Sequence, residues 1–270
     1  RREFHLAGLA GLFLLATSHV QAGLSEAIVK LKPSVVLIGT FKATDSPRFQ
    51  LRGTGFIVGD GQLVVTNSHV LPAPAGGDAP ALVVQVRQAS GEWQMRPAVM
   101  LETNPAVDLA LLRMEGAPGT AARLGDSNSV REGDDLAFMG FPIGGVLGFS
   151  PVTHRATVSS ITPAALPSPS AGRLSEMAIR GLRNGTFNIF QLDATAYPGN
   201  SGGPLFHPET GEVLGVLNMV LIKGTRESAL SQPSGISYAI PGVHVREMLN
   251  ALRHLTLLYL RHKFHGPHVH

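Results

Sequence analysis

Residues 198–205 have the sequence PGNSGGPL, and the interpretation of the whole chain starts from this stretch. Glycines on both sides of Ser201 permit a tight turn that presents the hydroxyl and points backbone N–H groups toward one place. A lone serine among glycines is equally typical of an ordinary turn. Its meaning therefore depends on what the rest of the chain supplies.

Two earlier segments supply the partners that a serine nucleophile needs. Residues 66–70 read TNSHV and residues 108–113 read DLALLR, which gives the order His69, Asp108, Ser201. A serine hydroxyl needs a base within hydrogen-bond reach, and that base needs a carboxylate that holds its ring in one tautomer. Taken singly, His69 is also explained as a strand-end histidine and Asp108 as a turn cap. Taken together, the three residues predict a His-Asp-Ser triad.

These segments resemble those of serine proteases with the chymotrypsin fold, and most closely the bacterial HtrA/Deg branch. Further landmarks of that branch occur in order at residues 53–58 (GTGFIV), 191–194 (QLDA) and 235–241 (GISYAIP), so the resemblance covers about residues 24–252. The first landmark lacks the helix-forming glycine pattern of a nucleotide-binding loop. The resemblance implies an all-β fold of two six-stranded antiparallel β-barrels with a C-terminal helix.

The resemblance also implies a mechanism and a set of site residues. His69 would take the proton of Ser201 as the hydroxyl attacks a peptide carbonyl, and Asp108 would orient the imidazole ring. No metal or organic cofactor is needed. The oxyanion hole is expected at Gly199, Asn200 and Ser201, with the N–H groups of Gly199 and Ser201 as donors. The substrate pocket is expected to be lined by Thr195, Ala196, Leu217, Asn218, Met219 and Ile236.

The expected pocket is uncharged. By resemblance its floor falls on Thr195, and Ile236 stands where relatives with deep pockets have glycine, so a small or medium apolar side chain should be preferred. Asp193 lies in the preceding strand and is not expected at the pocket base.

Two departures from related enzymes affect the expected regulation. Asn200 replaces the aspartate that pairs with a newly cut N-terminus in digestive proteases, so activation by such a cleavage is not expected. Only residues 253–270 follow Leu252, so the PDZ domain common in HtrA enzymes is not expected after the protease domain. HtrA relatives often trimerise through an N-terminal segment. Residues 23–34 lack an obvious aromatic anchor, so a homotrimer stays open.

The residue pattern itself also favours a β-rich fold. Evenly spaced short apolar runs bounded by turn residues indicate a barrel or a sandwich. The predicted strands are residues 35–40, 55–58, 63–66, 82–86, 109–112, 136–139, 156–158, 187–190, 213–217 and 236–240. Small residues around positions 117–126 mark a junction, and residues 163–185 are predicted to form a mobile loop.

These patterns divide the chain into four parts, which are a signal segment at 1–22, two barrels at 23–120 and 121–242, and a C-terminal helix with a basic, histidine-rich tail at 243–270. A short helix is predicted over residues 26–32. An apolar stripe from Val245 to Leu255 predicts the C-terminal helix, packed on the second β unit. The tail is interpreted as frayed, with divalent-metal binding as the alternative.

The first 22 residues are typical of a secretory signal cleaved after Ala22. A membrane anchor is the alternative, although the apolar run from Leu6 to Ala16 is short of the ~20 residues needed to span a bilayer. The expected location is periplasmic or extracellular, without stable membrane insertion of the mature chain.

Composition excludes several other classes of function. The chain has 270 residues, 44% of them hydrophobic, and it has no cysteine, so disulfides, thiolate catalysis and cysteine-ligated metals are excluded. A net charge of +3 without a basic run gives no indication of nucleic-acid binding.

The sequence therefore predicts an exported serine endopeptidase that cleaves unfolded or extended polypeptides in protein quality control. A catalytically idle relative that binds peptides as a chaperone or scaffold is the alternative. An esterase is disfavoured, because its G-x-S-x-G elbow requires a strand-turn-helix context and the order Ser, Asp, His.

Overall fold

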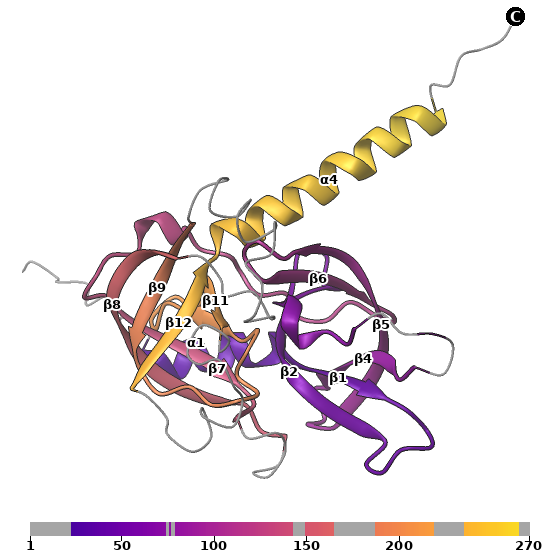
Figure 1. Cartoon of the computed structure of the whole chain (residues 1–270), viewed down its shortest axis with the longest axis horizontal. Coiled ribbons are helices and arrows are strands. Elements are labelled where there is room, and N and C mark those ends of the chain that lie inside the picture. The colour runs from indigo at the N-terminus through magenta and orange to yellow at the C-terminus, as the bar shows by residue number, and fades with distance from the viewer. Residues whose placement is uncertain are drawn as a thin grey trace, which may run out of the picture.

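The computed structural model describes residues 23–73, 76, 79–142, 149–164, 187–218 and 235–264, with the side chains of the last helix described as far as residue 255. Within these residues, twelve strands form two closed antiparallel barrels of six strands each, which lie side by side (Figure 1). Among the predicted segments, 1–22, Met219 and 265–270 lie outside the described residues, as does most of the predicted loop.

The first barrel has the strand order β1-β2-β3-β6-β5-β4. Its strands are β1 (Val35–Phe41), β2 (Phe49–Val58), β3 (Leu63–Asn67), β4 (Ala81–Arg87), β5 (Trp93–Asn104) and β6 (Leu109–Met114). Branched and aliphatic side chains fill its interior, among them Val36, Ile57, Val84 and Leu112. Such residues are favoured in strands because they pack well on a pleated surface.

The second barrel has the strand order β10-β11-β12-β9-β8-β7. Its strands are β7 (Asp135–Gly140), β8 (Val152–Ala164), β9 (Phe187–Asp193), β10 (Pro204–Phe206), β11 (Val213–Asn218) and β12 (Ile236–Pro241). Residues 115–134 connect the two barrels, so the predicted junction falls in this connection.

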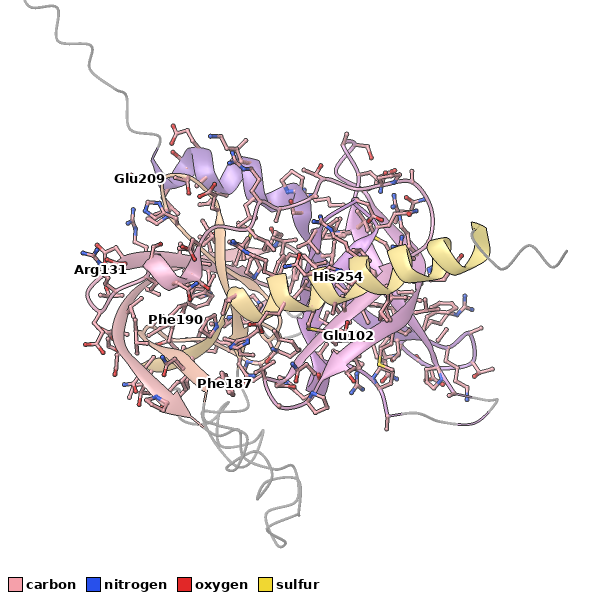
Figure 2. The ribbon with its side chains drawn as sticks, turned by 90° about the horizontal axis from the view of Figure 1, so that it is seen from above. Glu102, Arg131, Phe187, Phe190, Glu209 and His254 are labelled. Carbon is pink, nitrogen blue, oxygen red and sulfur yellow. The ribbon has the colours of Figure 1, made fainter. Side chains whose placement is uncertain are left out.

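In the described part of the chain, two α-helices flank the barrels. They are α1 (Leu24–Leu31) and α4 (Val243–Phe264), and three short 3₁₀ turns occur at η1 (Lys32–Ser34), η2 (Ser68–Val70) and η3 (Ser127–Ser129). Val245, Met248 and Leu249 of α4 are buried in an apolar cluster that both barrels share. Residues 250–255 of α4 are mostly exposed, with Leu255 at 63%, and the helix projects away from the barrels (Figures 1 and 2).

The structure differs from the sequence-based expectation at several elements. Strand β5 was not predicted, because only two of its twelve residues are buried and its side chains do not form an apolar run. Strand β10 was not predicted because it has only three residues and follows the glycine-rich turn directly. Strand β8 extends to Ala164 and so includes the first residues of the predicted loop. Helix α4 includes residues 261–264, which were assigned to a frayed tail, and its buried residues contact a cluster shared by both barrels.

Candidate active site

Asp108 lies just before β6 in an unusual backbone conformation. Its φ of 52° is in the left-handed region, which aspartate tolerates better than most residues. Its carbonyl oxygen accepts hydrogen bonds from Asn67 Nδ2 at 3.0 Å and from the Ser68 N–H at 3.2 Å. Ser68 Oγ also donates to the Leu109 carbonyl at 2.7 Å. The end of β3 and the start of β6 are thereby fixed to each other, and this determines where the carboxylate points.

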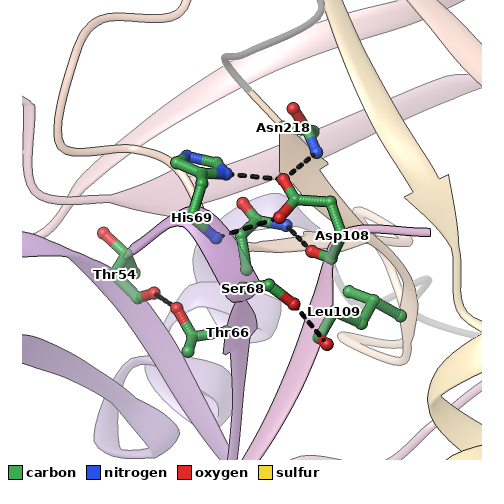
Figure 3. A network of polar contacts seen from close by, with 8 residues as sticks. Thr54, Thr66, Ser68, His69, Asp108, Leu109 and Asn218 are labelled. Atoms are coloured by element: carbon green, nitrogen blue, oxygen red, sulfur yellow. Dashed lines mark hydrogen bonds and ion pairs between the residues drawn. The ribbon is translucent and has the colours of Figure 1, made fainter. Parts of the chain in front are cut away.

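The carboxylate of Asp108 points at His69 (Figure 3). Asp108 Oδ2 lies 2.5 Å from His69 Nδ1, and Asp108 Oδ1 accepts from the His69 backbone N–H at 3.0 Å. A carboxylate can only accept, so this contact requires the imidazole proton on Nδ1 and leaves Nε2 as an acceptor. That tautomer is the one a general base for serine needs.

Asn218 is the third residue of this network. It is fully buried at the end of β11, and its Nδ2 donates to Asp108 Oδ2 at 2.8 Å. The contact joins the second barrel to the acidic residue on the first. Asn218 was predicted at a pocket wall, which stays a prediction, and its amide is bonded to Asp108.

The turn that carries Ser201 is shaped by glycines. Gly199 and Gly202 have φ values of 102° and 84°, which side chains with a Cβ rarely adopt. A Cβ on Gly202 would lie 2.1 Å from the Thr54 carbonyl oxygen. The Gly202 N–H donates to the Leu217 carbonyl at 2.9 Å, and the Leu217 N–H donates to the Gly203 carbonyl at 2.8 Å. The turn is therefore fixed to β11 directly beside Asn218.

Thr54 of β2 connects this turn to the first barrel. Its N–H donates to the Ser201 carbonyl at 2.8 Å, and its Oγ1 donates to the Gly199 carbonyl at 2.6 Å. The same Oγ1 accepts from the Phe141 N–H at 3.1 Å, at the end of β7. Thr54 is fully buried. Through the two hydrogen bonds of its hydroxyl, it links both barrels to the serine turn.

The three backbone N–H groups expected at the oxyanion hole differ in whether they already donate a hydrogen bond. The Asn200 N–H donates to the Tyr197 carbonyl at 3.0 Å and is already used. Within the described part of the chain, no hydrogen bond uses the N–H of Gly199 or of Ser201. These two groups are the candidate donors. The Asn200 side chain is fully buried, and neither of its polar atoms has a partner.

The other predicted pocket residues are less closely grouped. Ala196 and Leu217 are buried in the core of the second barrel. Thr195 is half-buried, and the preceding Ala194 bonds to Gly235 and Ser237 at 2.9 and 2.6 Å, beside Ile236. Ile236 is 42% exposed. The structure thus brings Thr195 and Ile236 to one region. That they line the substrate pocket stays a prediction.

No group of three or more histidine, aspartate or glutamate residues in the described part of the chain is arranged to hold a metal ion. No described helix combines the length and apolar character needed to cross a membrane.

Two closed barrels, with a His-Asp pair on the first and a glycine-framed serine on the second, define the class of chymotrypsin-like serine protease folds. The sequence matches the family described as "Trypsin-like peptidase domain" over residues 53–216. The chain belongs to the trypsin-like peptidase family and is HtrA-like.

Individual relatives agree with this assignment. The mitochondrial serine protease HTRA2 of Drosophila ananassae is 32% identical over 197 residues, covering 73% of this chain and 38% of that protein. A probable periplasmic DegP-like serine endoprotease of Pseudomonas putida is 33% identical over 193 residues, covering 71% and 33%. The chain thus spans less than half the length of these curated relatives.

Solved structures show the same fold. The HtrA-type protease AlgW with a tripeptide matches with a TM-score of 0.59 and 23% identity, covering 85% of this chain and 63% of that chain. An AlgW variant with a decapeptide matches with a TM-score of 0.60 and 23% identity, covering 86% and 67%.

Sequence reasoning missed the supporting roles of Thr54, Asn67, Ser68 and Asn218. The first three lie inside segments that were already quoted as landmarks, next to glycine or to His69. Their position beside the predicted triad was the available signal. Asn218 had no such signal, because its partner is 110 positions away in the sequence.

Proposed function

We propose that this chain is a serine endopeptidase in which Ser201 is the nucleophile, His69 the general base and Asp108 the residue that orients His69. The observation that carries the proposal is the 2.5 Å contact between His69 Nδ1 and Asp108 Oδ2. This contact keeps the imidazole proton on Nδ1 and leaves His69 Nε2 as the proton acceptor. The unused N–H groups of Gly199 and Ser201 supply the second requirement, which is a place for the oxyanion.

The chemistry then proceeds in two halves. As Ser201 Oγ attacks the peptide carbonyl carbon, its proton moves to His69 Nε2, and the carbonyl oxygen becomes an oxyanion at the N–H groups of Gly199 and Ser201. Collapse of this intermediate breaks the C–N bond, and His69 returns the proton to the leaving amine. Water repeats the attack on the acyl-enzyme with the same proton transfers and releases the acid. Each oxyanion donor contributes about 3 kcal/mol of transition-state stabilisation.

The family suggests the substrate and the setting. The relatives named above include a probable periplasmic endoprotease and a mitochondrial protease. We propose polypeptides with unfolded or extended segments as substrates, a role in protein quality control, and a location outside the cytoplasm. A homotrimer remains part of this proposal, to be tested by light scattering.

A second candidate function is a catalytically idle peptide-binding relative. It is favoured by one observation. Ser201 is only 4% exposed, and the hydrogen bonds among the described residues do not include one between His69 and Ser201. Catalytic hydrogen bonds are often long without substrate and tighten when it binds, so this geometry also fits a resting enzyme.

Labelling with a fluorophosphonate probe separates the two functions. An active triad makes Ser201 react covalently, and the labelled peptide is identified by mass spectrometry. Ser201→Ala is the control, since it removes a single oxygen from the turn and should abolish both labelling and casein hydrolysis. Absence of labelling in folded wild-type protein, with or without added peptide, would favour the idle relative.

A further inference from the structure

We propose that the end of the first barrel remote from the serine turn binds a small organic anion, a carboxylate or phosphate group carried on an apolar body. A cavity of about 720 Å³ lies there, between the end of α1, the turn after β4 and the connection between the barrels. This volume is in the range of about 300 to 1,000 Å³ typical of ligand sites, which often occupy barrel mouths. None of its lining residues belongs to the candidate active site.

Arg96 is the central observation. It pairs with Val84 in the β4–β5 ladder, and paired residues project to the same face of a sheet. Val84 is part of the apolar interior of the barrel, so Arg96 enters that interior at its open end. The arginine is 8% exposed and lines the cavity. A guanidinium has thus been placed at the mouth of an apolar core.

Among the described residues, no carboxylate pairs with Arg96. Its Nε and Nη2 donate to Gln94 Oε1 at 3.2 and 3.0 Å, and its Nη1 donates to the Ala117 carbonyl. These contacts use three of the five guanidinium N–H donors. Both acceptors are neutral, and a buried cation normally has an anionic partner. Two donors and a full positive charge remain for a ligand.

Two further cations line the same cavity. They are Lys32 at the end of α1 and Arg87 at the end of β4. Arg87 Nε donates to the Gly91 carbonyl at 3.3 Å. Ion pairs in the described part of the chain do form at other arginines, such as Arg113 with Asp60 at 3.2 Å, but they involve none of these three cations. No described acidic residue lines the cavity.

The rest of the lining determines the body of the ligand. Val29, Pro33, Val86 and Pro118 contribute apolar surface, and Val29 is 73% exposed. A simple inorganic ion would leave this surface in water, whereas an apolar group beside the anion would cover it. The combination selects an anion with an apolar substituent over a bare ion.

Protein-observed NMR titration with four probes tests the proposal. Benzoate and phenyl phosphate carry both features, benzyl alcohol has only the apolar body, and inorganic phosphate has only the charge. We expect saturable shifts of the amides of Val86, Ala89 and Thr120 with the first two, and binding at least roughly tenfold weaker for the others. The tighter of the first two identifies the head group.

Substitutions assign the binding to the three cations. Arg87→Gln should weaken benzoate or phenyl phosphate roughly tenfold, the effect of one lost charge-assisted hydrogen bond. Arg48→Gln, at an exposed position outside the cavity, removes the same charge and should change Kd by less than about twofold. Arg96→Gln should have the largest effect, and Lys32→Gln replaces it as the second variant should Arg96→Gln fail to fold.

Several results would overturn the site. They are the absence of saturable shifts, equal binding of benzyl alcohol and benzoate, equal binding of inorganic and phenyl phosphate, or equal weakening by Arg48→Gln and Arg87→Gln. Because the readout is binding and not proteolysis, failure here leaves the protease proposal untouched.

Discussion

Asn218 Nδ2 donates to Asp108 Oδ2 at 2.8 Å, and the same oxygen lies 2.5 Å from His69 Nδ1. One carboxylate oxygen thus receives two donors from opposite barrels, of which the Asn218 amide is fully buried and the His69 side chain is 29% exposed. Hydrogen bonds to a charged carboxylate are stronger than bonds between neutral groups, and two of them hold the carboxylate in one orientation. Asn218 is therefore a positioning residue for Asp108 in the proposed triad.

Asn218→Ala should lower kcat roughly 10- to 100-fold, the equivalent of losing one hydrogen bond to a charged group, about 1.5–3 kcal/mol. We expect KM to change little, because the amide nitrogen is bonded to Asp108. The exposed Asn128→Ala is the matched control and should leave kcat unchanged. In the Asp108→Asn background the same substitution should cost much less. Equal losses in both backgrounds would show that Asn218 acts independently of Asp108.

Asp108→Asn should reduce turnover by about 10⁴. The amide of asparagine can donate to His69 Nδ1, which stabilises the tautomer with its proton on Nε2 and removes the acceptor for the serine proton. Steady-state kinetics on a peptide substrate measures the effect, and circular dichroism checks the fold. A variant within tenfold of the wild type would mean that another carboxylate orients His69.

Thr54→Val tests whether one hydroxyl supports the serine turn. The substitution keeps the branched shape but leaves the Phe141 N–H and the Gly199 carbonyl without their partner, at a fully buried position. We expect a loss of about 1–3 kcal/mol in the free energy of unfolding and a lower kcat per folded molecule. Thr54→Ser keeps the hydroxyl and should recover most of the kcat. If the serine variant is as impaired as the valine variant, packing and not the hydroxyl is what the turn requires.

The sequence predicts the proposed triad residues because their chemistry requires local motifs, such as glycines around Ser201 and a strand end before His69. It indicated ten of the strands because their apolar residues cluster in short runs. It missed β5, in which only two of twelve residues are buried, and the short β10. The roles of Asn218 and Arg96 depend on contacts with distant segments, to Asp108 and to the Ala117 carbonyl. Such contacts are decided by barrel closure and register, which no local pattern encodes.

His154 predicts a pH dependence of stability that is separate from catalysis. Its ring stacks on Phe138 with centroids 4.8 Å apart, its Nε2 is buried without a partner, and burial lowers the pKa of His154 from its ordinary value of 6.5. The unfolded chain therefore binds a proton more readily than the folded one, so stability rises with pH. This contribution is complete above about pH 6.5 and stability is lost as the pH falls through the lower, folded pKa.

His154→Phe should remove this part of the acid sensitivity. The stack on Phe138 is preserved and no hydrogen bond is lost at Nε2, so the urea midpoint should be close to that of the wild type at pH 8 and above it at pH 5. His254→Phe, on the exposed part of α4, makes the same replacement without the burial. A midpoint difference between His154→Phe and wild type that is the same at both pH values would contradict this origin.

The last prediction concerns the residue before the cleaved bond. Ile236 is the first residue of β12 and pairs with Asp193, two residues before Thr195, and Ser237 Oγ donates to the Ala194 carbonyl at 2.6 Å. If Thr195 and Ile236 line the substrate pocket, as the family resemblance implies, the wild type should cut after Val, Ala or Leu in preference to Phe. Ile236→Gly should raise cleavage after Phe by roughly 10- to 200-fold relative to Val, the range that a methylene-sized change in a pocket produces.

Ile236→Val is the conservative control. Cleavage of a peptide library, read by mass spectrometry, gives all three profiles at once. If the ratio of cleavage after Phe to cleavage after Val is unchanged in Ile236→Gly, the pocket lies elsewhere. Cuts mainly after Lys or Arg would also contradict the assignment, because such a pocket needs an acidic residue and Thr195 is uncharged.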